Sequence, residues 1–91
     1  MAEIRLHIKI YGQVQGVFFR QSAKIKAEEL GLVGWVKNCE DGSVETIAQG
    51  EKDKLDEFIK WCRKGPPFSV VENVSVKWVK DVEDFSEFSI V

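Results

Sequence analysis

The sequence has few of the residues that build metal sites and disulfide frameworks, with one histidine and two cysteines among 91 residues. These are too few for a zinc knuckle, a histidine-rich metal site or a small fold held by several disulfides. We therefore expect neither a metal ion nor a cofactor. Cys39 and Cys62 are expected to be buried thiols that behave as small apolar side chains, with a single disulfide as the alternative.

Long apolar runs are also missing from the sequence. No run approaches the length of about 20 residues that spans a membrane, and residues 1–12 alternate instead of forming the apolar core of a signal peptide. We expect a soluble, cytoplasmic protein without a membrane partner. Because 44% of the 91 residues are hydrophobic, the chain can fold as one domain over residues 1–91, with any site on its surface or in a shallow groove.

A strong positive charge is absent as well. The formal net charge is −2, whereas general nucleic-acid binding depends on a basic excess, so no nucleic-acid partner is expected. The charge is nevertheless uneven, since residues 1–38 carry a net charge of +3 and residues 39–91 a net charge of −5. This asymmetry favours an anion site in the first part of the chain.

The apolar residues that are present follow the periods of strands and helices. Their spacing predicts strands at 4–11, 32–39, 43–49, 73–80 and 86–90 and helices at 19–30 and 51–64, with Gly12 ending the first strand. In the fourth strand Val74, Val76 and Trp78 are predicted to face inward. The element order predicts an α+β, ferredoxin-like βαββαβ sandwich, in which both helices cover one face of an antiparallel sheet of four to five strands.

Residues 12–20 break the local rules. The segment is short and apolar, and it places Arg20 at a helix start, where the helix dipole already contributes positive charge. Because Gly16 can adopt a positive φ, the loop N–H groups can curl towards Arg20 and bind an anion such as phosphate. The alternative is that Gly12 and Gly16 are ordinary turn residues and that Arg20 is a surface residue beside Glu28 or Glu29.

Asn38 is the second candidate, at the end of the strand predicted for residues 32–39. The ends of the first two strands can approach the same edge of the sheet, which would bring Asn38 to face the anion loop. A neutral amide can position a water molecule without repelling a dianion. The alternative is that Asn38 is a turn residue, as the nearby pair Asp41-Gly42 suggests.

Two segments of the sequence resemble the signatures of the acylphosphatase family. Residues 11–20, YGQVQGVFFR, contain the pattern Gly-x-Val-Gln-Gly-Val-x-Phe-Arg, and residues 34–50, GWVKNCEDGSVETIAQG, contain the second signature with its spacing. The resemblance extends over nearly the whole chain, and Phe18 and Cys39 lie at positions where the family varies. It implies the βαββαβ fold and the hydrolysis of the carboxyl-phosphate bond of acyl phosphates, without a metal ion or a covalent intermediate.

The resemblance also implies roles for individual residues. Arg20 would bind the phosphate, Asn38 would orient the attacking water, and the backbone of the loop would cradle the phosphate. The loop residues are Gln15, Gly16, Val17, Phe18 and Phe19. The substrate would be a small acyl phosphate, and we expect a monomer.

Two other functions are kept as alternatives. The first is a non-catalytic anion- or RNA-binding module of the same fold, for which Trp35, Trp61 and Trp78 would be candidate stacking residues. The second is a carbamoyl-phosphate-handling domain of the kind that is fused to larger maturation proteins.

Overall fold

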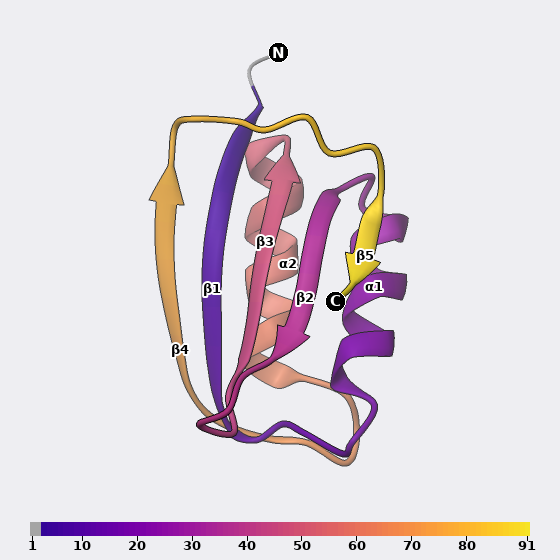
Figure 1. Ribbon diagram of the computed structural model, residues 1–91, viewed down its shortest axis with the longest axis vertical. Helices are drawn as coiled ribbons and strands as arrows, with labels where there is room; N and C mark the ends of the chain where they lie inside the picture. Colours follow the sequence, from indigo (N-terminus) through magenta and orange to yellow (C-terminus); the bar gives the residue numbers. More distant parts are fainter. Residues whose placement is uncertain (1–2) are drawn as a thin grey trace.

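The structure is a computed structural model that describes residues 3–91. It contains five strands and two helices, drawn in Figure 1. Their bounds are β1 Ile4–Gln13, α1 Phe19–Glu29, β2 Val33–Asn38, β3 Val44–Gly50, α2 Lys52–Lys64, β4 Val70–Val79 and β5 Phe88–Ile90. Each predicted element is present, and most boundaries agree with the prediction to within two residues.

The strands form a single sheet in the order β4-β1-β3-β2-β5. Both helices lie behind the same face of this sheet, which leaves the other face open (Figure 1). The predicted ferredoxin-like α+β fold is therefore confirmed. The sheet is antiparallel except at one edge, where β5 pairs with β2 in parallel, with Gly34 opposite Phe88. A long connection after β4 returns the chain across the end of the sheet, so that β5 enters in the same direction as β2 (Figure 1).

The core lies between the sheet and the helices, where the periods of the sequence place it. Alternate residues of β1 are fully buried, namely Leu6, Ile8 and Ile10. The helices contribute Phe19, Ala23 and Ala27 from α1 and Leu55, Phe58 and Cys62 from α2. Removal from water of the apolar surfaces of the sheet and of the helices is the main contribution to the stability of the sandwich.

The two cysteines differ in their surroundings. Both are free, and Cys62 is buried in the core, where burial raises the pKa of its thiol. Cys39 is only partly buried, so the expectation of two buried thiols is wrong for this residue. The physical reason is its place directly after β2, where the chain leaves the sheet, and its Sγ lies 3.8 Å from Oε1 of Glu45.

Two details of β1 and β4 correct the sequence prediction. β1 does not end at Gly12 but continues through a bulge to Gln13, and β4 begins at Val70 instead of residue 73. Gly12 has a φ of 130°, and a Cβ atom there would lie 2.1 Å from the carbonyl oxygen of Val70. The close pairing of the two strands at the bulge therefore requires glycine.

The prediction for the side chains of β4 holds only in part. Val74 and Val76 pack against the core, but Trp78 remains 41% exposed. β4 is an edge strand, so no further strand covers the outer flank of this ring. The Nζ atom of Lys52 lies 5.2 Å from the centroid of the Trp78 ring and covers part of it.

Candidate active site

The candidate site is built where three connections meet at one end of the sandwich. The loop between β1 and α1 and the turn between β2 and β3 both lie at the lower end in Figure 1. The connection from α2 to β4 passes the same end. This arrangement brings the end of β2, with Asn38, towards the start of α1, with Arg20.

The start of α1 has unpaired N–H groups that point out of the helix. The first intrahelical bond of this end is donated by the Ser22 N–H to the carbonyl oxygen of Phe18, at 3.1 Å. None of the side chains of residues 3–91 caps the helix, and its first turn holds no acidic residue. The earlier N–H groups therefore have no intrahelical acceptor, and together with the helix dipole they form a site suited to an anion.

The loop before α1 adopts the curl that the sequence predicted. Gly16 has a φ of 75° and Phe18 a φ of 64°, both in the left-handed region. A Cβ atom at Gly16 would meet nothing within 4 Å, so this glycine is needed for its backbone conformation and not for space. Left-handed residues in such a loop turn successive N–H groups towards one concave side.

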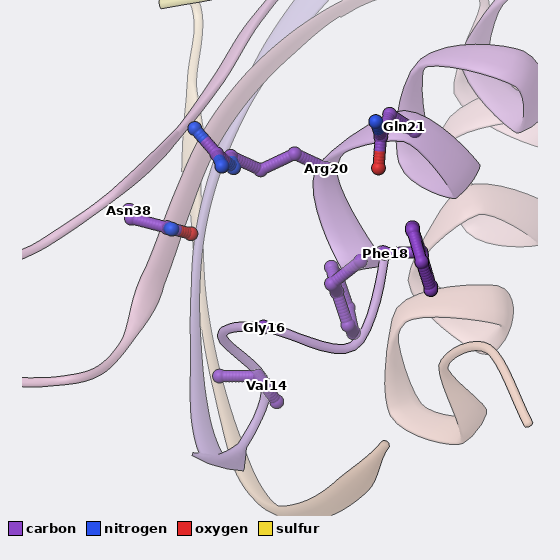
Figure 2. A pocket seen from close by; sticks show the side chains of 7 residues that line it. Val14, Gly16, Phe18, Arg20, Gln21 and Asn38 are labelled. Atoms are coloured by element: carbon purple, nitrogen blue, oxygen red, sulfur yellow. The ribbon is translucent and has the colours of Figure 1, made fainter. Parts of the chain in front are cut away.

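Arg20 and Asn38 line one cavity of about 210 Å³ with the loop. The residues around it are Val14, Gly16, Phe18, Phe19, Arg20, Gln21 and Asn38. In Figure 2 the side chains of Arg20 and Asn38 reach from opposite sides into the same space, with Gly16 next to it. The cavity has room for a group of the size of phosphate together with water. Val14 and Gln21 line the cavity and were not among the predicted site residues, whereas Gln15 and Val17, whose backbone was predicted to hold the phosphate, are not among the residues that line it.

The guanidinium of Arg20 has no ion pair within residues 3–91. The alternative placed it beside Glu28 or Glu29, but Glu28 pairs with Lys24 at 3.0 Å and Glu29 with Lys26 at 3.8 Å. The surface-pair alternative is therefore wrong. The partial positive charge of unpaired N–H groups repels a neighbouring cation. An anion bound between the N–H groups and the cation attracts both and makes the arrangement favourable.

Asn38 has a buried polar atom without a partner. Within residues 3–91, its Oδ1 atom accepts no hydrogen bond. Leaving a buried acceptor unpaired costs about 1–3 kcal/mol, so such an atom indicates a place for water or a ligand. The alternative of a turn residue does not fit, since the turn is held instead by the Gly42 N–H donating to the carbonyl oxygen of Cys39 at 3.1 Å.

Gln15 has a role that the sequence did not reveal. Its Nε2 atom donates to the carbonyl oxygens of Cys39, at 2.8 Å, and Ser43, at 2.9 Å. The side chain thereby ties the loop between β1 and α1 to the turn that follows Asn38. Only the backbone of Gln15 was expected to contribute. The signal in the sequence was that Gln15 is a polar residue in a loop with the apolar residues Val14 and Val17, which indicates that its side chain has a hydrogen-bond partner.

The turn after Asn38 is fixed by Asp41. Its Oδ1 atom accepts hydrogen bonds from the Oγ of Ser43 at 2.6 Å and from the Ser43 N–H at 3.0 Å. The Nζ atom of Lys9 lies 3.3 Å from the other carboxylate oxygen. The hydrogen bonds from Ser43, assisted by Lys9, lower the pKa of Asp41 to about 2.

A second group of charges lies on the open face of the sheet behind this turn. The Nε2 atom of His7 lies 2.5 Å from Oε2 of Glu45, and Lys37 lies 3.5 Å from Oε1. The hydrogen bond with His7, supported by Lys37, lowers the pKa of Glu45. His7 thus belongs to a hydrogen-bonded group of side chains on the sheet and lies outside the cavity that is lined by Arg20 and Asn38.

Within residues 3–91, no group of three or more His, Cys, Asp or Glu side chains is placed so that it could hold a metal ion. In the same part of the chain, neither helix has the length and apolar character needed to cross a membrane.

Comparison with known proteins places the chain in a family. The family model described as Acylphosphatase matches residues 6–90. An acylphosphatase of Methylococcus capsulatus is 44% identical over 87 residues, which cover 96% of this chain and 95% of that protein.

Solved structures give the same result. An acylphosphatase structure from Coxiella burnetii superposes with a TM-score of 0.94 at 46% identity and covers 99% of this chain and 94% of that one. The acylphosphatase from Bacillus subtilis gives a TM-score of 0.94 at 40% identity and covers 97% of this chain and 98% of that one. The chain therefore belongs to the acylphosphatase family, and it is an enzyme of that family.

Proposed function

We propose that this chain hydrolyses the carboxyl-phosphate bond of acyl phosphates, with Arg20 and the 15–19 backbone holding the phosphate and Asn38 orienting the water. One observation carries the proposal. Arg20, whose guanidinium has no ion pair within residues 3–91, and Asn38, whose buried Oδ1 atom has no hydrogen-bond partner there, line the same cavity at the uncapped start of a helix. This is the set of groups that binding a phosphate next to a water molecule requires.

The phosphate is held by charge and by fixed N–H donors. The planar guanidinium of Arg20 can bind two phosphate oxygens at once, and the loop N–H groups face the others. Phosphoryl transfer passes through a loose transition state that spreads negative charge over the equatorial oxygens. Donors that are already oriented towards these oxygens stabilise that charge without reorganisation.

Asn38 acts on the water. Its Oδ1 atom, which lacks a partner, accepts a hydrogen bond from the water and aims a lone pair of the water oxygen at phosphorus. A new P–O bond forms to the water oxygen, and the bond from phosphorus to the acyl oxygen breaks, so the carboxylate leaves with the electron pair. The proton lost by the water passes to an oxygen of the substrate's own phosphate.

The leaving group explains the simplicity of the site. A carboxylate is a stable anion, since carboxylic acids have pKa values of roughly 4, so it leaves without a proton donor. No histidine or glutamate is therefore needed beside Arg20 and Asn38. None of the seven residues that line the cavity carries a carboxylate. A carboxylate there would repel a dianionic substrate.

We propose that the protein acts as a cytoplasmic monomer on a small molecule and that it binds no nucleic acid. The open sheet face supports the last point, because three of its cations are already paired with carboxylates. These pairs are Arg5 with Glu83 at 2.6 Å, Lys9 with Asp41 at 3.3 Å and Lys37 with Glu45 at 3.5 Å. Paired cations release fewer counterions from a nucleic acid, so they contribute little to binding it.

Hydrolysis of benzoyl phosphate by the purified chain, with and without EDTA, tests the proposal. We expect hydrolysis at the same rate in both samples, because no step uses a metal ion. Loss of activity in EDTA that an added divalent metal restores would contradict the mechanism. No hydrolysis in either sample would contradict the proposed function.

A further inference from the structure

Glu45 of β3 contacts both chain neighbours of Asn38. Its Oε1 atom lies 3.5 Å from the Nζ atom of Lys37 and accepts a hydrogen bond from the Sγ of Cys39, at 3.8 Å. Lys37 lies opposite Glu45 in the register of β2 and β3, and Cys39 directly follows the last residue of β2. One carboxylate oxygen therefore contacts the residue before Asn38 and the residue after it.

The other carboxylate oxygen of Glu45 is held from β1. The Nε2 atom of His7 lies 2.5 Å from Oε2 of Glu45. The Glu45 side chain is 23% exposed, so these contacts are partly shielded from water. Hydrogen bonds with an ionised acceptor are shorter and stronger than those between neutral groups. His7 thus fixes the carboxylate that contacts the two residues beside Asn38.

These contacts lie on the face of the sheet opposite the cavity. Successive side chains of a strand point to opposite faces, and Glu45 stands between the buried residues Val44 and Thr46 of β3. Asn38 reaches into the cavity beside α1, on the face that both helices cover (Figure 1). Glu45 is not among the residues that line the cavity. Any effect of Glu45 on the reaction must therefore pass through the backbone of β2.

We propose that Glu45 is a positioning residue, which fixes the direction of the Asn38 amide by holding Lys37 and Cys39 on either side of it. This inference rests on the proposed function and adds a residue to its machinery. The backbone dihedral angles at Asn38 set where its amide points, and they are restrained when both neighbouring side chains are held. A displacement of about 1 Å can lower a rate by about two orders of magnitude, so a smaller loosening at Asn38 has a measurable effect.

The test compares kcat for benzoyl phosphate and the inhibition constant of inorganic phosphate in the wild type, Glu45→Ala and Glu45→Gln. We expect Glu45→Ala to lower kcat about tenfold and to leave the inhibition constant unchanged, because Asn38 acts on the water in the proposed mechanism. Glu45→Gln keeps the size of the side chain and one oxygen acceptor, so kcat should lie between the other two values. This variant keeps the test decisive if Glu45→Ala does not fold.

The matched control is Glu83→Ala. It also removes a carboxylate paired with a cation of the sheet, since Glu83 pairs with Arg5 at 2.6 Å. Glu83 belongs to the connection after β4, which crosses the opposite end of the sheet from the turn between β2 and β3 (Figure 1). We expect kcat of Glu83→Ala to equal that of the wild type.

A double variant tests whether Glu45 acts through Asn38. Without the amide there is nothing left to position, so Asn38→Ala combined with Glu45→Ala should have the same kcat as Asn38→Ala alone. Losses that multiply would show that the two residues act independently and would overturn the positioning role. The same conclusion follows if both Glu45 variants keep the wild-type kcat, if phosphate inhibition weakens in parallel with kcat, or if Glu83→Ala shows an equal loss.

Failure of the proposed function gives a different result. A wild type that hydrolyses no benzoyl phosphate would overturn the proposed function, and this inference with it. Any of the contrary results above, obtained with an active wild type, would overturn the role of Glu45 and leave the proposed function in place.

Discussion

Arg20 is the residue on which the proposed phosphate binding depends most. It has no ion pair within the described residues 3–91, so its charge contributes little to the stability of the fold. In the proposed function, the guanidinium binds an anion together with the N–H groups at the start of α1. A residue of this kind can be replaced at small cost to stability and at large cost to activity.

We expect Arg20→Ala to lower kcat/KM for benzoyl phosphate by about two orders of magnitude or more, because a fixed donor to the transition state is lost. The melting temperature should stay close to that of the wild type. Arg20→Lys should recover only part of the activity, since an ammonium cannot form the two parallel hydrogen bonds of a guanidinium. Full activity in Arg20→Ala would remove this residue from the site.

Sequence reasoning found the residues whose types are unusual for their place. Arg20 at a helix start and Gly16 in an apolar loop were predicted, and the structure brings Arg20 and Asn38 to one cavity. The side chain of Gln15 was missed, because its partners are the carbonyl oxygens of residues 24 and 28 positions further along the chain. Only the folded sheet brings these carbonyl groups next to the loop.

At the scale of elements, the site depends on the link between the loop before α1 and the turn between β2 and β3. The sequence predicted both elements, but not that one side chain joins them. The two hydrogen bonds of Gln15 fix the distance between the loop N–H groups and the end of β2. Catalysis by orientation is sensitive to small displacements of this kind.

Gln15→Ala should therefore lower kcat about tenfold or more, although Gln15 does not line the cavity. Stability should fall by about 1–3 kcal/mol, because two hydrogen bonds that contribute about 0.5–1.5 kcal/mol each are lost. Steady-state kinetics and chemical unfolding measure the two effects. Gln13→Ala is the control, since Gln13 is exposed at the end of β1 and should leave kcat unchanged. Equal kinetics for both variants would contradict the positioning role.

Elements whose partners are distant in sequence were predicted least well. The extension of β1 past Gly12 and the early start of β4 depend on each other, because Gly12 pairs with Val71 and Gln13 with Val70. The parallel entry of β5 depends on the path of the connection after β4. Local periodicity contains no information about either, whereas it sufficed for both helices and for the order of the elements.

At the scale of the whole molecule, carboxylates with lowered pKa values link stability to pH. The pKa of Asp41 is lowered from 3.8 to about 2 by Ser43 and Lys9, and that of Glu45 is lowered by His7 and Lys37. A group with a lower pKa in the folded state stabilises the fold above its ordinary pKa. This contribution is lost as the pH falls through the pKa of the folded state.

We expect the Asp41 contribution to be complete above pH 3.8 and to disappear as the pH falls to about 2. Asp41→Asn should lower the stability at neutral pH and reduce the loss of stability across that acidic range. Chemical unfolding of both proteins over a series of pH values measures this difference. The same acid-induced loss of stability in Asp41→Asn and in the wild type would show that Asp41 does not contribute to it.

The most direct test of the account is the effect of Asn38→Ala on kcat and on phosphate binding, measured in the same preparation. In the proposed mechanism Asn38 orients water and does not hold the phosphate, so kcat should fall about a hundredfold or more while the inhibition constant of inorganic phosphate stays unchanged. If kcat and phosphate affinity fell in parallel, Asn38 would bind substrate instead of positioning water. If neither changed, the unpaired amide oxygen at the end of β2 would have no part in the reaction.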